Sequence, residues 1–426
     1  VALASGATQT GFGRTGTVNW ITTKKTTGFT AVSGEGYFCD TAASGAFTLT
    51  LPSSPSAGNI VGLKDYNGNF ATANLTIGRG GSPINGGSAI DVVISTAGAS
   101  IFLVYVDATQ GWVATQDDSS TFSGVAFLEA TGGTITTSGN CKIHTFTGPG
   151  TFAVSQISST APENVVSYMV VAGGASGGVA EGGGGGGAGG FRELKSPITP
   201  YTASPLDGYP SAPNRITVTA ASFPITVGAG GAQNPGGPPA GNPGANSVFS
   251  TITSTGGGPG ARFREANDPQ AAGGSGGGGT GRRTPGCGPN PGGNGNTPPV
   301  SPPQGNPGGA ANTPSPTSSN DAGGGGGGAT AAGTDSGYNT GQPGGAGATT
   351  NITASPVAYG GGGGGGSQAS TGGSGGAGGG GAGFSGSSGG ATGTANTGGG
   401  GGGAGAGPTA GQAGGSGIVV IRYKFQ

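Results

Sequence analysis

Charged side chains are scarce in this chain of 426 residues: Asp, Glu, Lys and Arg make up 7% of it, and the formal net charge is -1. Proteins that hold nucleic acid by its phosphates need clustered Lys and Arg. Arg282 and Arg283 form an isolated pair, which is typical of a solvated loop. We therefore expect no nucleic-acid partner.

Histidine and cysteine are almost absent. His144 is the single histidine, so multi-histidine metal sites are excluded and a catalytic triad would depend on one residue inside a predicted strand. Cys39, Cys141 and Cys287 are far apart and odd in number, without a disulfide or metal-binding spacing. We expect no catalytic residue, cofactor or metal, and hence no enzyme. Carboxylate pairs of the kind glycosidases use stay open, because spacing in space is not visible in sequence.

Long apolar runs are missing too. No stretch of eighteen or more large apolar residues exists, which predicts no membrane insertion. The stretch Val1–Thr10 lacks the basic and apolar regions of a signal peptide. A precursor that had already been cleaved would look the same.

Glycine is what the chain has in excess. Of 107 glycines, 24 lie in Val1–Ala172 and 83 in Gly173–Gln426. No strict Gly-X-Y triplet connects them, which argues against collagen. A chain so poor in side chains is either disordered or held by main-chain hydrogen bonds between closely packed backbones. The longest glycine runs are Gly182–Gly187, Gly276–Gly279, Gly323–Gly328, Gly360–Gly366, Gly378–Gly381 and Gly398–Gly403.

The first part of the chain reads as β structure. Residues 1–19 are small and polar and are predicted to be a connector, whereas 20–118 carries short alternating segments and no helical periodicity. This pattern favours a β-sandwich or barrel module. Asn67-Gly68 predicts a hairpin turn, and Trp112 is expected in the core. The predicted strands are Phe47–Leu51, Ile60–Tyr66, Leu75–Ile77, Val92–Ile94, Ile101–Val106 and Val113–Thr115.

Two strongly apolar strands bracket the glycine-rich part. A β linker segment is predicted over 119–172, and it ends in Val165–Val171. Ile418–Tyr423 is a matching apolar strand at the far end of the block. If the two pair in one sheet, the residues between them form a compact insertion rather than an open tether. We therefore predict one glycine-rich domain, 173–426, closed by strand 418–423.

Polyglycine II helices are the structure such runs favour. This left-handed helix has three residues per turn and leaves every N–H and C=O pointing sideways. Side-by-side helices satisfy those groups, but only where no Cβ separates the backbones. Loops between the runs carry most of the larger side chains, and loops on a rigid scaffold are common recognition surfaces. The candidate receptor contacts in them are Arg192, Tyr201, Tyr209, Arg262, Phe263, Arg264 and Tyr338.

Several phrases resemble virion proteins of tailed phages. Phe70–Gly78 and Leu103–Trp112 look like a β module of tail-fibre and other virion proteins, particularly those of cyanophages. Tyr168–Gly174, Phe223–Gly231 and Gly414–Tyr423 resemble the glycine-rich domain that ends many phage tail fibres. The resemblance implies a tail fibre or adhesin in the virion, outside the cell, that attaches to a host-surface glycan or outer-membrane protein and contacts other tail proteins through its N-terminal region. It supplies no catalytic residues.

Two other functions stay open at this point. The first is a self-assembling structural filament or appendage protein without a receptor. The second is a tailspike that depolymerises glycans. Because phage fibres are often trimers, a homotrimer is the first expectation for the assembly.

Overall fold

The computed structural model of the protein describes residues 18–86, 91–116, 127–179, 181–233, 241–261, 272–281, 290–311, 320–407 and 410–425. Over these ranges the chain is built from strands, with only two short 3-10 helices, η1 (Ala161–Asn164) and η2 (Ala212–Asn214). The all-β prediction is confirmed. No helix in the described ranges is long and apolar enough to span a membrane.

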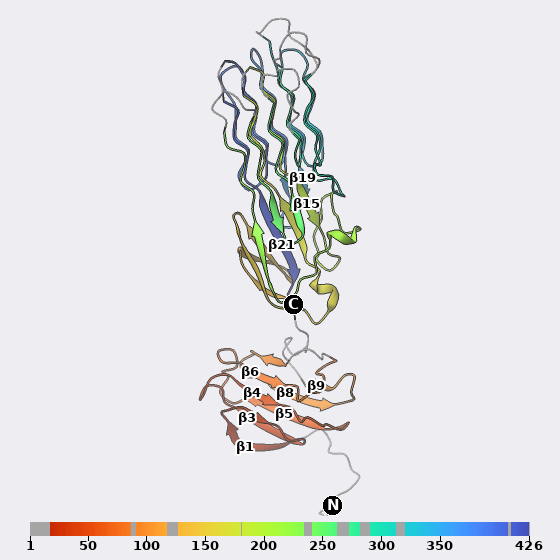
Figure 1. Ribbon diagram of the computed structural model, residues 1–426. Coiled ribbons are helices and arrows are strands. Elements are labelled where there is room, and N and C mark those ends of the chain that lie inside the picture. Colours follow the sequence, from red (N-terminus) through yellow and green to blue (C-terminus); the bar gives the residue numbers. More distant parts are fainter. Residues whose placement is uncertain are drawn as a thin grey trace, which may run out of the picture. The chain divides into compact units, whose positions relative to one another are not determined.

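Two compact units make up the chain, Val1–Ala126 and Phe127–Gln426 (Figure 1). The segment predicted as a separate β linker, 119–172, lies from Phe127 onward in the second unit. Its strands do not form a sheet of their own. They pair with strands that come much later in the chain, as β12 (Cys141–Phe146) does with β21 (Ile418–Lys424).

The first unit is a sandwich of two sheets with orders β1-β3-β5-β8-β9 and β2-β4-β6-β7. From β1 to β6 the chain alternates between the sheets, so that β1, β3 and β5 run parallel, as do β2, β4 and β6. No barrel closes among the described strands. The strands are β1 (Asn19–Lys25), β2 (Phe29–Thr30), β3 (Glu35–Cys39), β4 (Phe47–Thr50), β5 (Ile60–Asp65), β6 (Leu75–Gly78), β7 (Val92–Ile94), β8 (Ser100–Tyr105) and β9 (Trp112–Gln116).

This alternation corrects the prediction of a hairpin at Asn67-Gly68. Gly68 does have a positive φ of 71°. However, the next strand, β6, pairs with β4 and β7 in the other sheet, so the turn is part of a crossover. A turn signal fixes the local backbone and not the sheet that the next strand joins.

Alternating side chains from the two sheets fill the core of the first unit. Leu49, Leu63 and Ile101 are fully buried in one cluster with Trp112, as predicted for that indole. Strand periodicity of two places every second residue inward. The core is therefore an ordinary side-chain interior.

Two five-stranded sheets form the base of the second unit, with orders β10-β13-β16-β17-β18 and β11-β12-β21-β14-β15. β19 and β20 form a two-stranded sheet of their own. The strands besides β12 and β21 are β10 (Glu129–Thr131), β11 (Thr134–Ser138), β13 (Gly150–Gln156), β14 (Ser167–Val171), β15 (Phe191–Leu194), β16 (Ser222–Thr226), β17 (Ser247–Phe249), β18 (Ile252–Ser254), β19 (Ala348–Thr350) and β20 (Val357–Tyr359).

The two bracketing strands pair as predicted. β21 lies between β12 and β14 and is antiparallel to both, with Met169 opposite Val420. Each face of the sheet meets a different apolar cluster: Tyr168 and Ile421 belong to one, and Met169 and Val420 to the other. Burial on both faces explains why the two strands read as continuous apolar runs.

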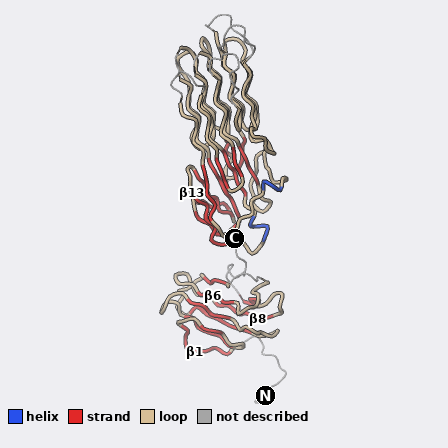
Figure 2. The backbone as a smooth tube through the Cα atoms, in the orientation of Figure 1, coloured by secondary structure: helices blue, strands red, loops and turns tan. Residues whose placement is uncertain are grey.

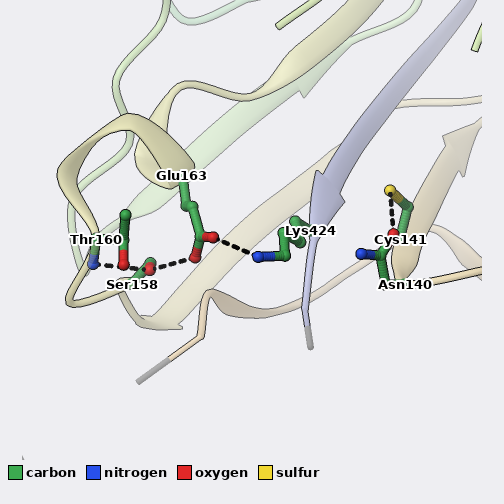
Figure 3. Close-up of polar contacts among 6 residues, drawn as sticks. All are labelled: Asn140, Cys141, Ser158, Thr160, Glu163 and Lys424. Atoms are coloured by element: carbon green, nitrogen blue, oxygen red, sulfur yellow. Dashed lines mark hydrogen bonds and ion pairs between the residues drawn. The ribbon is translucent and has the colours of Figure 1, made fainter. Parts of the chain in front are cut away.

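A polar network fastens the end of β21 (Figure 3). The Nζ atom of Lys424 lies 2.6 Å from Oε1 of Glu163 in η1. The Ser158 hydroxyl donates to the other carboxylate oxygen at 2.7 Å and accepts from the Thr160 amide at 3.0 Å. The last strand is thus joined to the segment that precedes β14.

Candidate functional site

Extended glycine-rich strips run from the base sheets through the rest of the second unit (Figure 2). Strip 173–178 shows how they are held: each of its six amides donates to a neighbouring backbone carbonyl. Every third amide reaches the same neighbour, as Gly173 and Ser176 do with strip 242–245. The other two neighbours are 412–415, bonded by Gly174 and Gly177, and 184–187, bonded by Ala175 and Gly178.

This period of three is that of polyglycine II. The carbonyls of strip 173–178 accept from three further neighbours, at 231, 257–260 and 401–404. Six neighbours surround one strip, and its backbone hydrogen-bonding capacity is largely used within the protein. The predicted lattice of packed polyglycine helices is therefore the structure of the glycine-rich part.

Four of the six longest glycine runs form the inside of this lattice. Strip 183–190 donates to three strips and accepts from three others, and 361–366 does the same. A Cβ on Gly185 would collide with the carbonyl oxygen of Gly363, and one on Gly362 with that of Gly326. Glycine is required there because the next backbone occupies the place of a side chain. We call 173–178, 183–190, 323–328, 360–367 and 398–404 the inner strips.

Each inner strip has one end at the base and one at the opposite, distal end. At the base three of these strips join strands: 173–178 follows β14, 183–190 continues into β15, and 360–367 follows β20. Within the described residues, the distal end includes the turns 320–321, 337–340, 368–371 and 386–389, together with 181–182 and 405–407. Backbone and side-chain hydrogen bonds join these turns: Gln368 N donates to Asp321 O at 2.9 Å, and Ser367 Oγ to Asn339 O at 2.8 Å.

Tyr338 is the large side chain that the distal end presents to solvent, with 55% of its surface exposed. The side-chain Nδ2 of Asn320 donates a hydrogen bond to the Tyr338 hydroxyl at 2.6 Å. The phenol is therefore oriented by a second distal turn while its ring stays open to a ligand. Tyrosine combines a flat apolar ring with a polar tip, which suits recognition surfaces.

Three other predicted contact residues lie at the base. Arg192 is in strand β15, not in a loop, and its guanidinium donates to Asn214 Oδ1 at 2.6 Å. Tyr201 packs on an apolar cluster of the base with Arg422 5.3 Å from its ring centroid. Tyr209 packs on the other cluster, and Arg215 lies 4.4 Å from its ring. These side chains make contacts within the base.

The remaining three candidates, Arg262, Phe263 and Arg264, lie outside the described residues.

Sequence reasoning did not single out Asn320 or Gln368, which border the distal turns. A signal was present, because both residues stand within three positions of an inner glycine run. Residues that flank a run of fixed length must lie at an end of the lattice.

A buried polar cluster at the base holds the loop that follows β15. Glu193 accepts from the Ser204 amide at 2.8 Å and from the Thr350 hydroxyl at 2.5 Å. Burial raises the pKa of its carboxyl. The Arg422 guanidinium donates to the carbonyls of Ile352 and Pro200 at 3.2 and 3.0 Å. These bonds link β21, β15 and the β19-β20 pair into one base.

His144 also makes contacts inside the base. Its Nδ1 lies 2.7 Å from the carbonyl oxygen of Gly132, and its Nε2 lies 3.2 Å from the Tyr423 hydroxyl. The imidazole is fully buried, and burial lowers its pKa from the ordinary value of 6.5. Within the described ranges, no group of three His, Cys, Asp or Glu side chains could hold a metal ion.

A family model described as a glycine-rich domain matches residues 145–424. The chain belongs to this glycine-rich domain family. The match begins near the end of β12 and ends in β21, so it covers the base strands from β13 onward as well as the lattice. No curated protein matches the chain.

Proposed function

We propose that this glycine-rich domain protein is a phage tail fibre or adhesin that attaches the virion to its host without catalysis. In this proposal the distal end of the lattice contacts a glycan or an outer-membrane protein of the host surface. The first unit faces other tail proteins, and three chains assemble together. The protein then acts outside the cell, as a part of the virion.

The position of Tyr338 carries the proposal. It is exposed on a turn between two strips whose backbones are fixed by the lattice, and Asn320 orients it from another turn. A binding residue on a preorganised support loses little conformational entropy when it contacts a ligand. The lattice supplies that support with almost no side chains of its own.

The test is binding of the fluorescently labelled full-length chain to a panel of bacterial strains, cyanobacteria included, measured by flow cytometry. Tyr338→Ala is expected to weaken binding to the recognised strain about tenfold, within the range of interface hot spots. Tyr338→Phe keeps the ring and is expected to retain most of the binding.

Thr349→Ala is the matched control, because Thr349 is exposed on β19 at the base. Its binding should equal that of the unchanged chain. If Tyr338→Ala binds the strain as well as the unchanged chain does, the distal end is not the surface that contacts the host. Long filaments formed by the purified protein, with no strain bound, would favour a structural appendage, and shortening of a bound polysaccharide would contradict the non-catalytic role.

A further inference from the structure

The first unit carries a row of aromatic side chains on the outer face of the β1-β3-β5-β8-β9 sheet. Tyr37 and Ile101 point into the core, so their neighbours Phe38 and Phe102 point outward by strand alternation. Trp20 points outward with them and lies 5.0 Å from Phe38 and 6.0 Å from Phe102, between ring centroids. Tyr66, which is 50% exposed, extends the row beyond Phe38 at 6.4 Å. We call these four side chains the aromatic face.

Glycine at position 36 lets the indole of Trp20 lie flat on the sheet. Gly36 is directly opposite Trp20 in the β1-β3 pairing. A Cβ built on Gly36 would be 2.9 Å from two ring carbons of the indole, closer than real contacts allow. The ring therefore covers the sheet with one face and turns the other outward. A half-buried flat ring of this kind is a stacking surface whose position is fixed before a ligand arrives.

Lys64 gives the aromatic face a positive charge, while the charge of a second lysine, Lys24, is balanced by the carboxylate of Asp40. Lys64 lies opposite Phe38 on one neighbouring strand and opposite Ser100 on the other. This cross-strand row is adjacent to the one that holds Trp20 and Phe102. Lys64 donates one hydrogen bond, to the carbonyl of Gly98, and an ammonium group has three donors. Lys24 lies 5.0 Å from the Tyr66 ring centroid and is held by Asp40, a carboxylate that is itself 99% buried.

We propose that the aromatic face binds an acidic saccharide. The C–H bonds of a sugar ring pack on the flat indole and the neighbouring phenyl rings, and Lys64 pairs with the carboxylate of a uronic acid unit. Aromatic rings supply apolar contact area, and a lysine ammonium acts as a point charge that accepts varied anion geometry. This site is in the first unit and does not depend on the distal end.

Charge argues against a second copy of the chain as the occupant. In a two-fold contact the same face meets itself, so Lys64 of one copy would approach Lys64 of the other. Like charges that meet in an interface oppose association. A polyanionic sugar chain complements the charge of Lys64.

The experiment uses the full chain and two probes, polygalacturonate as the acidic polysaccharide and dextran as the neutral one. Migration in native gels that contain either polymer gives the affinities, and tryptophan fluorescence gives the location. The chain has two tryptophans, of which Trp112 is fully buried. Polygalacturonate is expected to retard the protein and to change the emission of Trp20, while dextran retards it at least tenfold less.

Trp20→Ala is expected to weaken polygalacturonate binding at least tenfold, and Trp20→Phe to restore most of it. Lys64→Gln should abolish the preference for the acidic polymer, whereas Lys142→Gln, the same charge change in the second unit, should leave it intact. Unchanged Trp112 emission in Trp20→Ala shows that the core has folded.

Three outcomes would overturn the proposal. The first is an absence of retardation by polygalacturonate, and the second is equal retardation by both polymers. The third is self-association, seen by sedimentation, that Trp20→Ala abolishes, because it would assign the aromatic face to another copy. Loss of cell binding through Tyr338 changes none of these readouts, so the two proposals fail separately.

Discussion

The two units of this protein reach a packed interior by opposite means. In the first unit, inward side chains such as Leu63 and Trp112 fill the space between two sheets. In the lattice of the second unit, backbones lie against backbones, and glycine is needed wherever a Cβ would collide with the next backbone. Close packing and satisfied hydrogen bonds are common to both. The comparison shows that a protein interior does not need large side chains when every strip has neighbours for its amides.

The response to substitution should therefore be reversed between the units. In a side-chain core, removal of atoms leaves a cavity. In the lattice, addition of a single carbon forces backbones apart. Three measurements would break or sharpen this comparison, and each requires the thermal or urea transition of the two units to be followed separately.

The largest effect is expected from Leu63→Ala in the first unit. Leu63 is fully buried on β5, between Tyr37 and Ile101 on the neighbouring strands. The change should lower the free energy of unfolding of this unit by about 4 kcal/mol. The transition of the second unit should stay where it is, and a joint shift of both transitions would show that the units do not unfold independently.

Gly362→Ala should cost slightly less, about 3 kcal/mol, and only in the second unit. The added methyl group would collide with the carbonyl of Gly326 inside the lattice. Gly337→Ala is the control, because a Cβ at Gly337 meets no atom within 4 Å. Surface changes of that kind stay within about 0.5 kcal/mol. Equal stability of both variants in urea unfolding would contradict the need for glycine in the inner strips.

A smaller effect is expected from pH. Burial lowers the pKa of His144 below 6.5, so the unfolded chain takes up a proton before the folded protein does. Neutral His144 therefore contributes its full stabilisation of the folded state above pH 6.5. This stabilisation is lost as the pH falls from 6.5 through the lower pKa that His144 has in the folded protein. Glu193, whose pKa is raised by burial, acts in the opposite direction as the pH falls.

The difference between the unchanged chain and His144→Gln isolates the histidine. Melting temperatures at pH 7.5 and 5.5 should show that the second unit loses stability relative to this variant as the pH falls. The first unit contains no histidine and should not change with this substitution. A difference that stays constant between the two pH values would mean that His144 keeps an ordinary pKa when folded.

Much of the fold could be predicted from the sequence because its strongest signals are local. Strand Val92–Ile94 and the apolar strand pair Val165–Val171 and Ile418–Tyr423 were predicted close to their observed bounds. β1 to β3 were missed, since Asn19–Lys25 alternates poorly. The crossover at Asn67-Gly68 and the place of Arg192 on a strand depend on pairing across the chain, which a local pattern does not encode.

For the candidate site, the sequence could supply only the list of larger side chains between glycine runs. It could not tell the base from the distal end, and this division separates Tyr338 from Arg192, Tyr201 and Tyr209 in the structure. The direction in which each strip runs decides the end at which a loop emerges. Whether a strip runs toward the base or toward the distal end depends on how many turns precede it in the chain. The number of turns is a property of the whole lattice.

The central position of β21 has a consequence for biosynthesis. β12 and β14 leave the ribosome early, but the strand that belongs between them is made about 250 residues later, as the positions in the sheet show. Until residue 424 has been made, their facing edges lack a partner, and exposed strand edges promote aggregation. The second unit can therefore complete its folding only once β21 has been made, and the nascent glycine-rich stretch must stay soluble until this strand is available.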